Sequence, residues 1–90
     1  MDEFLSKYPL KRFAAGETIL ELGERVSYVY VIKSGMVKIF DINKDGEVKI
    51  ILYDVDYECL PVAAAFNKSD YALYYYEAFS DCELYVMPKE

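Results

Sequence analysis

The chain has 90 residues, a formal net charge of −6 at pH 7 and a hydrophobic fraction of 54%. This length and composition predict one domain over residues 1–90 with a modest core, and they exclude intrinsic disorder. The acidic charge argues against direct binding of nucleic acid or an anionic membrane, and the absence of histidine excludes Ser-His and Cys-His catalysis.

The first predicted elements are short. A helix is expected over Glu3–Lys7, and Pro9 ends it because the residue before a proline is driven out of the helical region. A turn is predicted at Phe13–Glu17, where Gly16 can adopt a positive φ. A strand over Thr18–Leu22 follows.

The clearest strand pattern is Ser27–Lys33, which is dense in β-branched and aromatic residues. Ser34-Gly35 interrupts it, and Met36–Ile42 is the next predicted strand. Asp45-Gly46 is typical of a hairpin turn, with Glu47–Tyr53 as the returning strand. We interpret Tyr28–Ile42 and Glu47–Tyr53 as the paired centre of the domain.

The second half of the chain is less regular. Asp54–Glu58 is expected to be an acidic turn, and Val62–Phe66 is expected to form a short helix because alanine favours helices. Tyr71–Ala78 and Glu83–Met87 are predicted strands, and Pro88 is typical of the first turn of a helix. Many short strands separated by glycine indicate a mostly β fold, a barrel or jelly roll.

Few residues could carry chemistry. Cys59 and Cys82 form no Cys-x-x-Cys pair, so no metal or cofactor is expected, and a cupin-like enzyme is the weakest hypothesis without histidine. A reactive thiol at Cys59 is a subsidiary idea, and buried, inert packing is favoured for both cysteines. Glu77 lies within a tyrosine-rich strand, and we interpret it as an edge-strand charge that discourages aggregation.

Targeting signals are not recognisable in the sequence. The first residues are acidic and lack the basic and apolar regions of a signal peptide. The longest apolar runs are short and carry charges, so no transmembrane helix is expected. These features predict a cytoplasmic protein with reduced thiols.

Four stretches in order resemble the cyclic-nucleotide-binding-type sensor domain of Crp/Fnr transcription regulators; they are residues 13–24, 28–40, 43–47 and 76–88. The resemblance covers roughly residues 8–90. It implies a double-stranded β-helix or jelly roll of about eight short strands with short flanking helices. It also implies that the domain senses an effector and that a homodimeric regulator reads the signal out on DNA.

The sequence departs from this family in the segment that would hold the cyclic phosphate, at about Asp56–Leu73. Nucleotide-binding members have a Gly-Glu start and an Arg followed by a small hydroxyl residue, and the Arg clamps the phosphate. These positions fall near Cys59-Leu60-Pro61 and Ala72-Leu73, and the last arginine of the chain is Arg25. We therefore expect no conventional binding of cyclic AMP or cyclic GMP.

The candidate effector pocket is apolar and aromatic. It would take a small-molecule effector of low charge, or stay empty and serve only packing. Its predicted residues are Tyr57, Cys59, Leu60, Pro61, Phe66, Ala72, Leu73 and Tyr74.

The chain ends at Glu90, where the family's long dimerisation helix and helix-turn-helix would follow. It is expected to be either a fragment of a longer regulator or a shortened product, and in both cases this segment would not contact DNA itself. The alternative function is a ligand-free interaction or dimerisation module that uses a tyrosine-rich face.

Overall fold

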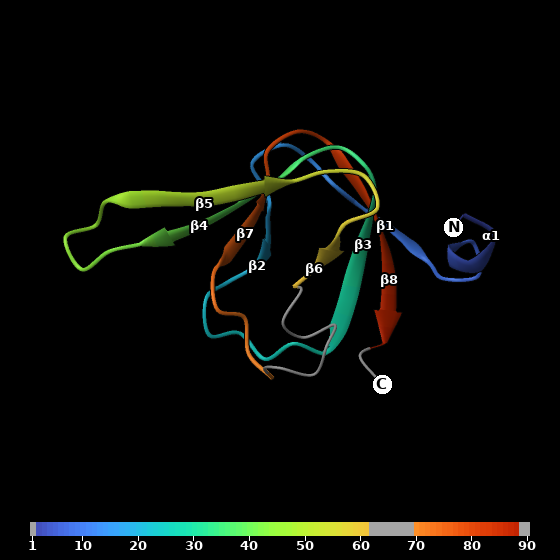
Figure 1. Ribbon diagram of the computed structural model, residues 1–90, viewed down its shortest axis with the longest axis horizontal. Coiled ribbons are helices and arrows are strands. Elements are labelled where there is room, and N and C mark those ends of the chain that lie inside the picture. Colours follow the sequence, from blue (N-terminus) through green and yellow to red (C-terminus); the bar gives the residue numbers. More distant parts are fainter. Residues whose placement is uncertain (1, 62–69, 89–90) are drawn as a thin grey trace.

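The computed structural model describes residues 2–61 and 70–88. They form two four-stranded antiparallel sheets, in the orders β1-β8-β3-β6 and β2-β7-β4-β5 (Figure 1). The elements are α1 (Asp2–Leu5), β1 (Leu10–Phe13), β2 (Thr18–Leu20), β3 (Tyr28–Ser34), β4 (Val37–Ile42), β5 (Val48–Asp54), β6 (Cys59–Leu60), β7 (Tyr75–Ala78) and β8 (Cys82–Pro88). The predicted mostly β roll is confirmed. In the part of the chain described, no helix is long and apolar enough to cross a membrane.

The core lies between the inner faces of the two sheets. Strand β7 shows how alternation builds it, because Tyr76 and Ala78 are buried while Tyr75 and Glu77 are only half-buried. A second, smaller cluster lies where α1 places Leu5 against Val31 of β3 and Tyr85 of β8. The largest fully buried side chains are Leu5, Ile32, Leu60, Leu84 and Val37.

The hairpin of β4 and β5 is confirmed and extends away from the rest of the roll (Figure 1). Asn43 fixes its turn, because Oδ1 accepts hydrogen bonds from the backbone N–H of Asp45 (2.9 Å) and of Glu47 (3.0 Å). Gly46 has a φ of +85°, as the Asp-Gly pattern predicts.

Only the second half of Tyr28–Ile42 pairs with the segment Glu47–Tyr53, because the first half belongs to the other sheet. Strand β3 pairs with β6 and β8, whereas β4 pairs with β5 and β7 in the other sheet. Gly35 is therefore a corner at which the chain passes between sheets. Local sequence could not show this, because the partners of both strands come later in the chain.

Other boundaries differ from the sequence-based expectation. The strand predicted over Tyr71–Ala78 is regular only from Tyr75, and Tyr71 forms an isolated bridge with Arg25. Pro88 does not open a helix; it is the last residue of β8, paired with Tyr28. Strand β1 pairs with β8 only as far as Tyr85. Pro88 lies beyond that stretch, so its missing N–H breaks no hydrogen bond with β1.

Strands β1 and β6 were not predicted, and both form by pairing with distant strands. The sequence of β1, Leu-Lys-Arg-Phe, has no alternation, yet it pairs along β8. Strand β6 has only two residues and pairs with Tyr30 and Val31 of β3. The helix predicted at Val62–Phe66 lies outside the described residues.

The interpretation of Glu77 as an edge-strand charge is wrong. Strand β7 lies between β2 and β4, and the Glu77 carboxylate forms an ion pair of 3.2 Å with Lys38 Nζ on β4. This pair lies on the outer face of its sheet, since Glu77 alternates with the buried Tyr76 and Ala78. Glu77 therefore neutralises the charge of Lys38 on the neighbouring strand and does not protect a sheet edge.

The corner at Gly35 tolerates no side chain. Its φ is +100°, and an added Cβ would lie 2.5 Å from the carbonyl oxygen of Asp81 and 2.8 Å from Cys82 Sγ. The next residue is held in place, because Met36 N–H donates to Ser80 Oγ at 3.0 Å and the Cys82 thiol donates to the Met36 carbonyl at 3.2 Å. Cys82 is thus a packing residue at the start of β8, as expected.

We predict that Gly35→Ala destabilises the domain far more than Gly46→Ala. Both glycines have positive φ, so both variants incur backbone strain of roughly 1–2 kcal/mol. Only Gly35 adds a clash with backbone, which costs roughly a further 1–3 kcal/mol; a Cβ at Gly46 meets nothing within 4 Å. Urea unfolding of the two variants measures the difference, and equal losses of stability would contradict the account of the corner.

Candidate functional site

The candidate site is a cavity of about 170 Å³ between the β4–β5 side of one sheet and the chain that enters β7. It is mainly apolar, with one acidic side chain. Its lining residues are Ile39, Ile51, Leu52, Asp54, Pro61, Tyr71, Leu73, Tyr74 and Tyr76.

A β-bulge shapes one wall of this cavity. Ile39 of β4 pairs with Leu52, but the next residue, Phe40, pairs with Ile50. Ile51 is left without a partner in β4, which is how a bulge redirects side chains. Two adjacent residues of β5, Ile51 and Leu52, therefore both line the cavity, although an undistorted strand would direct them to opposite faces.

Asp54 is the acidic residue of the site. It ends β5 directly opposite Val37, whose side chain is fully buried, so its carboxyl group lies on the inner face. Asp54 itself is only 4% exposed. Among the residues described, it is the single charged or polar side chain classed with the core.

The environment of Asp54 favours its neutral form. Burial raises the pKa of Asp54 to about 7, and the hydrogen bond with Glu58 and the charge of that residue add to the shift. Glu58 is fixed nearby, because its Oε1 accepts the N–H of Val55 at 2.9 Å. The turn that carries Glu58 is itself attached to β3, through a bond from Ile32 N–H to the Glu58 carbonyl at 3.1 Å.

Two neighbours respond to the Asp54 charge. Burial, then the charge of Asp54, then Tyr74 raise the pKa of Tyr76 to about 12. Burial and the charge of Asp54 also raise the pKa of the Cys59 thiol. A raised pKa reduces the thiolate fraction, so the site favours an inert Cys59 over a reactive one.

The structure brings together only some of the predicted pocket residues. Pro61, Leu73 and Tyr74 line the cavity, and Leu60 and Ala72 belong to the core. Cys59 is half-buried on β6, Tyr57 is exposed with a φ of +68°, and Phe66 lies outside the described residues.

Asp54 is not among the predicted site residues. Its position at the start of an acidic segment predicted a solvated turn. The signal that could have found it is the period of two in a strand, because Asp54 lies two residues after Leu52. This period would have predicted that the Asp54 carboxyl group lies on the same face of the strand as Leu52.

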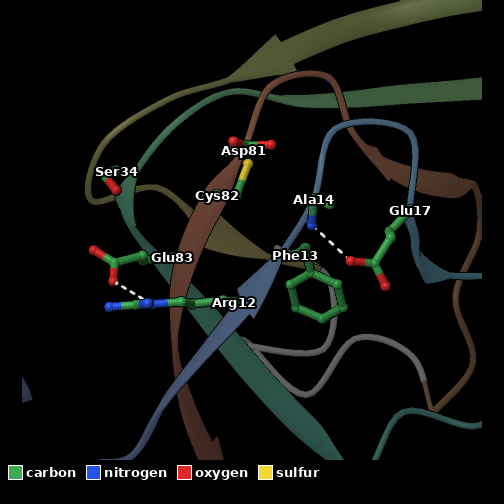
Figure 2. Close-up of a pocket in the computed structure, with 8 residues that line it drawn as sticks. All are labelled: Arg12, Phe13, Ala14, Glu17, Ser34, Asp81, Cys82 and Glu83. Atoms are coloured by element: carbon green, nitrogen blue, oxygen red, sulfur yellow. Dashed lines mark hydrogen bonds and ion pairs between the residues drawn. The ribbon is translucent and has the colours of Figure 1, made fainter.

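A second, wider hollow of about 520 Å³ lies where β1 and β8 meet the corner, and Figure 2 shows its lining. Its four charged side chains already have partners within the protein. Arg12 Nε donates to Glu83 Oε2 at 3.0 Å, and Glu17 Oε1 accepts the Ala14 N–H at 2.6 Å (Figure 2). Asp81 Oδ1 accepts the N–H of Ala15 at 2.9 Å. We assign these groups to holding the turn.

Positive charge is scarce at the candidate cavity. None of the described residues that line it is basic. Arg12 is paired with Glu83 on the other side of the fold, and Arg25 bridges Tyr71 through its backbone but is exposed. The described residues also contain no group of three or more side chains suited to hold a metal ion.

The alternative hypothesis needs an exposed aromatic face, and two aromatic pairs lie on or next to β4, β5 and β7. Phe40 stacks on Tyr75 with ring centroids 5.3 Å apart, and the rings of Tyr53 and Phe79 meet edge to face at 5.1 Å. Tyr53 and Phe79 are exposed. Binding of a partner or a second copy by this face stays a prediction.

Comparison with known protein families identifies the family of this chain. The family model of the cyclic nucleotide-binding domain matches residues 10–90. The chain belongs to this family. No curated protein matches the sequence significantly.

Solved structures of other proteins share the roll. The sensor domain of the transcriptional regulator DNR from Pseudomonas aeruginosa is 22% identical, with a TM-score of 0.82 over 97% of this chain and 58% of that one. The c-di-GMP responsive global regulator CLP from Xanthomonas campestris is 20% identical, with a TM-score of 0.87 over 98% and 42%. The Catabolite Activator Protein of Thermus thermophilus is 19% identical, with a TM-score of 0.81 over 98% and 41%.

These neighbours confirm the resemblance to Crp/Fnr-type sensor domains that the sequence indicated. The chain spans between 41% and 58% of the length of the three structures. At these sequence identities the similarity shows a shared fold only. The residues that line the pocket are those of this chain and are not inferred from the neighbours.

We predict that Asp54→Asn flattens the pH dependence of stability. The pKa of Asp54 is about 7 in the folded chain and near 4 when unfolded. Between these values the folded state holds a proton that the unfolded state lacks, so stability falls as pH rises, by up to about 1.4 kcal/mol per pH unit. The Asp54→Asn variant has no carboxyl group to titrate at this position, so it lacks this loss of stability as the pH rises.

Urea unfolding from about pH 4 to about pH 8 measures this slope. The matched control is Asp56→Asn, which removes an exposed carboxylate two residues away and should retain the wild-type profile. Identical pH profiles for Asp54→Asn and the wild type would show that Asp54 is an ordinary acid.

Proposed function

We propose that this domain is the sensor part of a Crp/Fnr-like transcription regulator and that its effector is not cyclic AMP or cyclic GMP. The observation that supports the exclusion of cyclic AMP and cyclic GMP is the buried carboxyl group of Asp54 in the cavity. A homodimeric regulator and an effector of low charge are parts of the same proposal.

Charge is the first argument against a cyclic phosphate. A buried phosphate needs a basic partner, and a bidentate arginine is the strongest. The described lining offers an acid and no base. A phosphate brought beside Asp54 would find no counter-ion among the described lining residues, and leaving acidic groups unpaired in a desolvated site is costly.

Size is the second argument. Pockets for drug-sized ligands usually measure about 300–1,000 Å³, whereas this cavity measures about 170 Å³. An engineered cavity of about 150 Å³ in another protein accommodates benzene. The site therefore suits a group the size of one ring, not a nucleotide with base, ribose and phosphate.

The role as a sensor, and not as the DNA-reading part, fits the elements that are described. Their single helix, α1, has four residues, whereas groove recognition needs a helix or ribbon that can enter the DNA groove. The two regulators compared with this chain, DNR and CLP, are named as a transcriptional regulator and as a responsive global regulator. We infer a regulatory output for this domain by analogy of fold.

We predict that calorimetric titration with cyclic AMP or cyclic GMP gives no saturable heat below roughly 1 mM ligand. Micromolar binding of either nucleotide would overturn the proposed effector class. In that case Arg25→Ala is the informative variant, because Arg25 faces Tyr71 across a backbone bridge. Loss of the nucleotide signal in that variant would locate the missing phosphate clamp.

A further inference from the structure

We propose that the cavity binds a small organic cation, an alkylated ammonium group, with Asp54 as its counter-ion. This inference rests on the proposed function, because it names the effector class of the same site. Three tyrosines share the cavity with that carboxyl group and complete the argument; they are Tyr71, Tyr74 and Tyr76.

The electrostatic argument is that the described lining of the site offers a carboxyl group and no basic side chain to neutralise it once it ionises. Asp54 is buried, and Glu58 lies within hydrogen-bonding reach of it. None of the described lining residues is basic, and the whole chain carries a net charge of −6. An apolar wall strengthens the attraction of a cation because water does not screen it.

The aromatic argument is that tyrosine rings attract cations through their negative faces. Such contacts contribute about 0.5–2 kcal/mol each, and aromatic cages are a common means of recognising quaternary ammonium groups. The cavity joins Tyr74, which is half-buried, and Tyr76, which is buried, to the Asp54 carboxyl group. A phosphate would gain nothing from these rings, whereas an ammonium group would.

The size argument agrees with the charge. A trimethylammonium group is compact and nearly spherical, and it presents only methyl groups to its surroundings. It therefore fits a site of about 170 Å³ that is otherwise lined by aliphatic residues such as Ile39 and Leu52. A larger part of the ligand could extend past Tyr71, which is half exposed at 51%.

The acid also gives the site a defined pH response. Below about pH 7 the Asp54 carboxyl group holds its proton and cannot act as a counter-ion. The groups that face it are Glu58, Cys59, Tyr74 and Tyr76. Burial raises the pKa of Cys59 and raises that of Tyr76 to about 12, so the response near neutrality belongs to Asp54.

The test compares choline with its neutral carbon isostere, 3,3-dimethyl-1-butanol, in binding titrations followed by NMR. The two probes share shape and differ in charge. We expect choline to bind roughly tenfold more tightly at about pH 8 than at about pH 6, because the bound cation holds the acid in its ionised form. The isostere should bind at least about tenfold more weakly than choline at the higher pH and show no pH dependence.

Variants of the chain assign the effect to Asp54. In Asp54→Asn, choline should lose its advantage over the isostere, and retained binding of the isostere shows that the cavity is intact. Asp56→Asn removes an exposed carboxylate nearby and should leave the preference for choline unchanged. Equal loss in both variants would mean that overall charge, and not Asp54, attracts the cation.

The outcomes separate this inference from the proposed function. Equal affinity for choline and the isostere, or no binding of either, would overturn the cation assignment and leave the exclusion of cyclic nucleotides standing. Micromolar binding of cyclic AMP to the same protein would overturn the proposed function itself, whatever choline does.

Discussion

The corner at Gly35 is the constraint on which the rest of the domain depends. Its positive φ and the close approach of Asp81 and Cys82 let the chain leave one sheet at Ser34 and enter the other at Val37. The register of the second sheet begins there, since Val37 pairs with Ala78 on one side and Asp54 on the other. The corner thereby determines which residues of β5 and β7 face the interior.

The same register explains why an acid is buried in this chain. Pairing with Val37 places Asp54 on the inner face, where the lining is otherwise aliphatic and aromatic. A buried carboxylate without a basic partner normally neutralises itself by taking up a proton, and the adjoining Glu58 increases this tendency. The domain thus keeps the family's roll while its cavity has electrostatics opposite to those a phosphate requires.

Most of the fold could be predicted from the sequence, and the exceptions share one cause. Residue composition and turn residues predicted β3, β4, β5 and β8, because these signals are local. The division of Tyr28–Ile42 between two sheets, the two-residue β6 and the polar β1 arise from pairing with distant strands, which local patterns do not encode. The family resemblance supplied the global arrangement that the local patterns lacked.

The site was predictable only in outline. The absence of an arginine after Arg25 and the aromatic character of the pocket could be read from residue types alone. The inward direction of Asp54 was missed, because the predicted strand ended at Tyr53 and the face of Asp54 is set by its pairing with Val37. Acids beside turns are usually solvated, and that general rule concealed the one that is buried.

The central claim is that Asp54 is a buried acid with no basic partner among the residues that the structure describes, and its own titration tests this most directly. A pH titration of the Asp54 side-chain carboxyl signal by ¹³C NMR gives its pKa in the folded domain. The account predicts a midpoint of about 7. A midpoint near the ordinary value of about 4 would mean that Asp54 is solvated or paired with a base, and it would contradict the account.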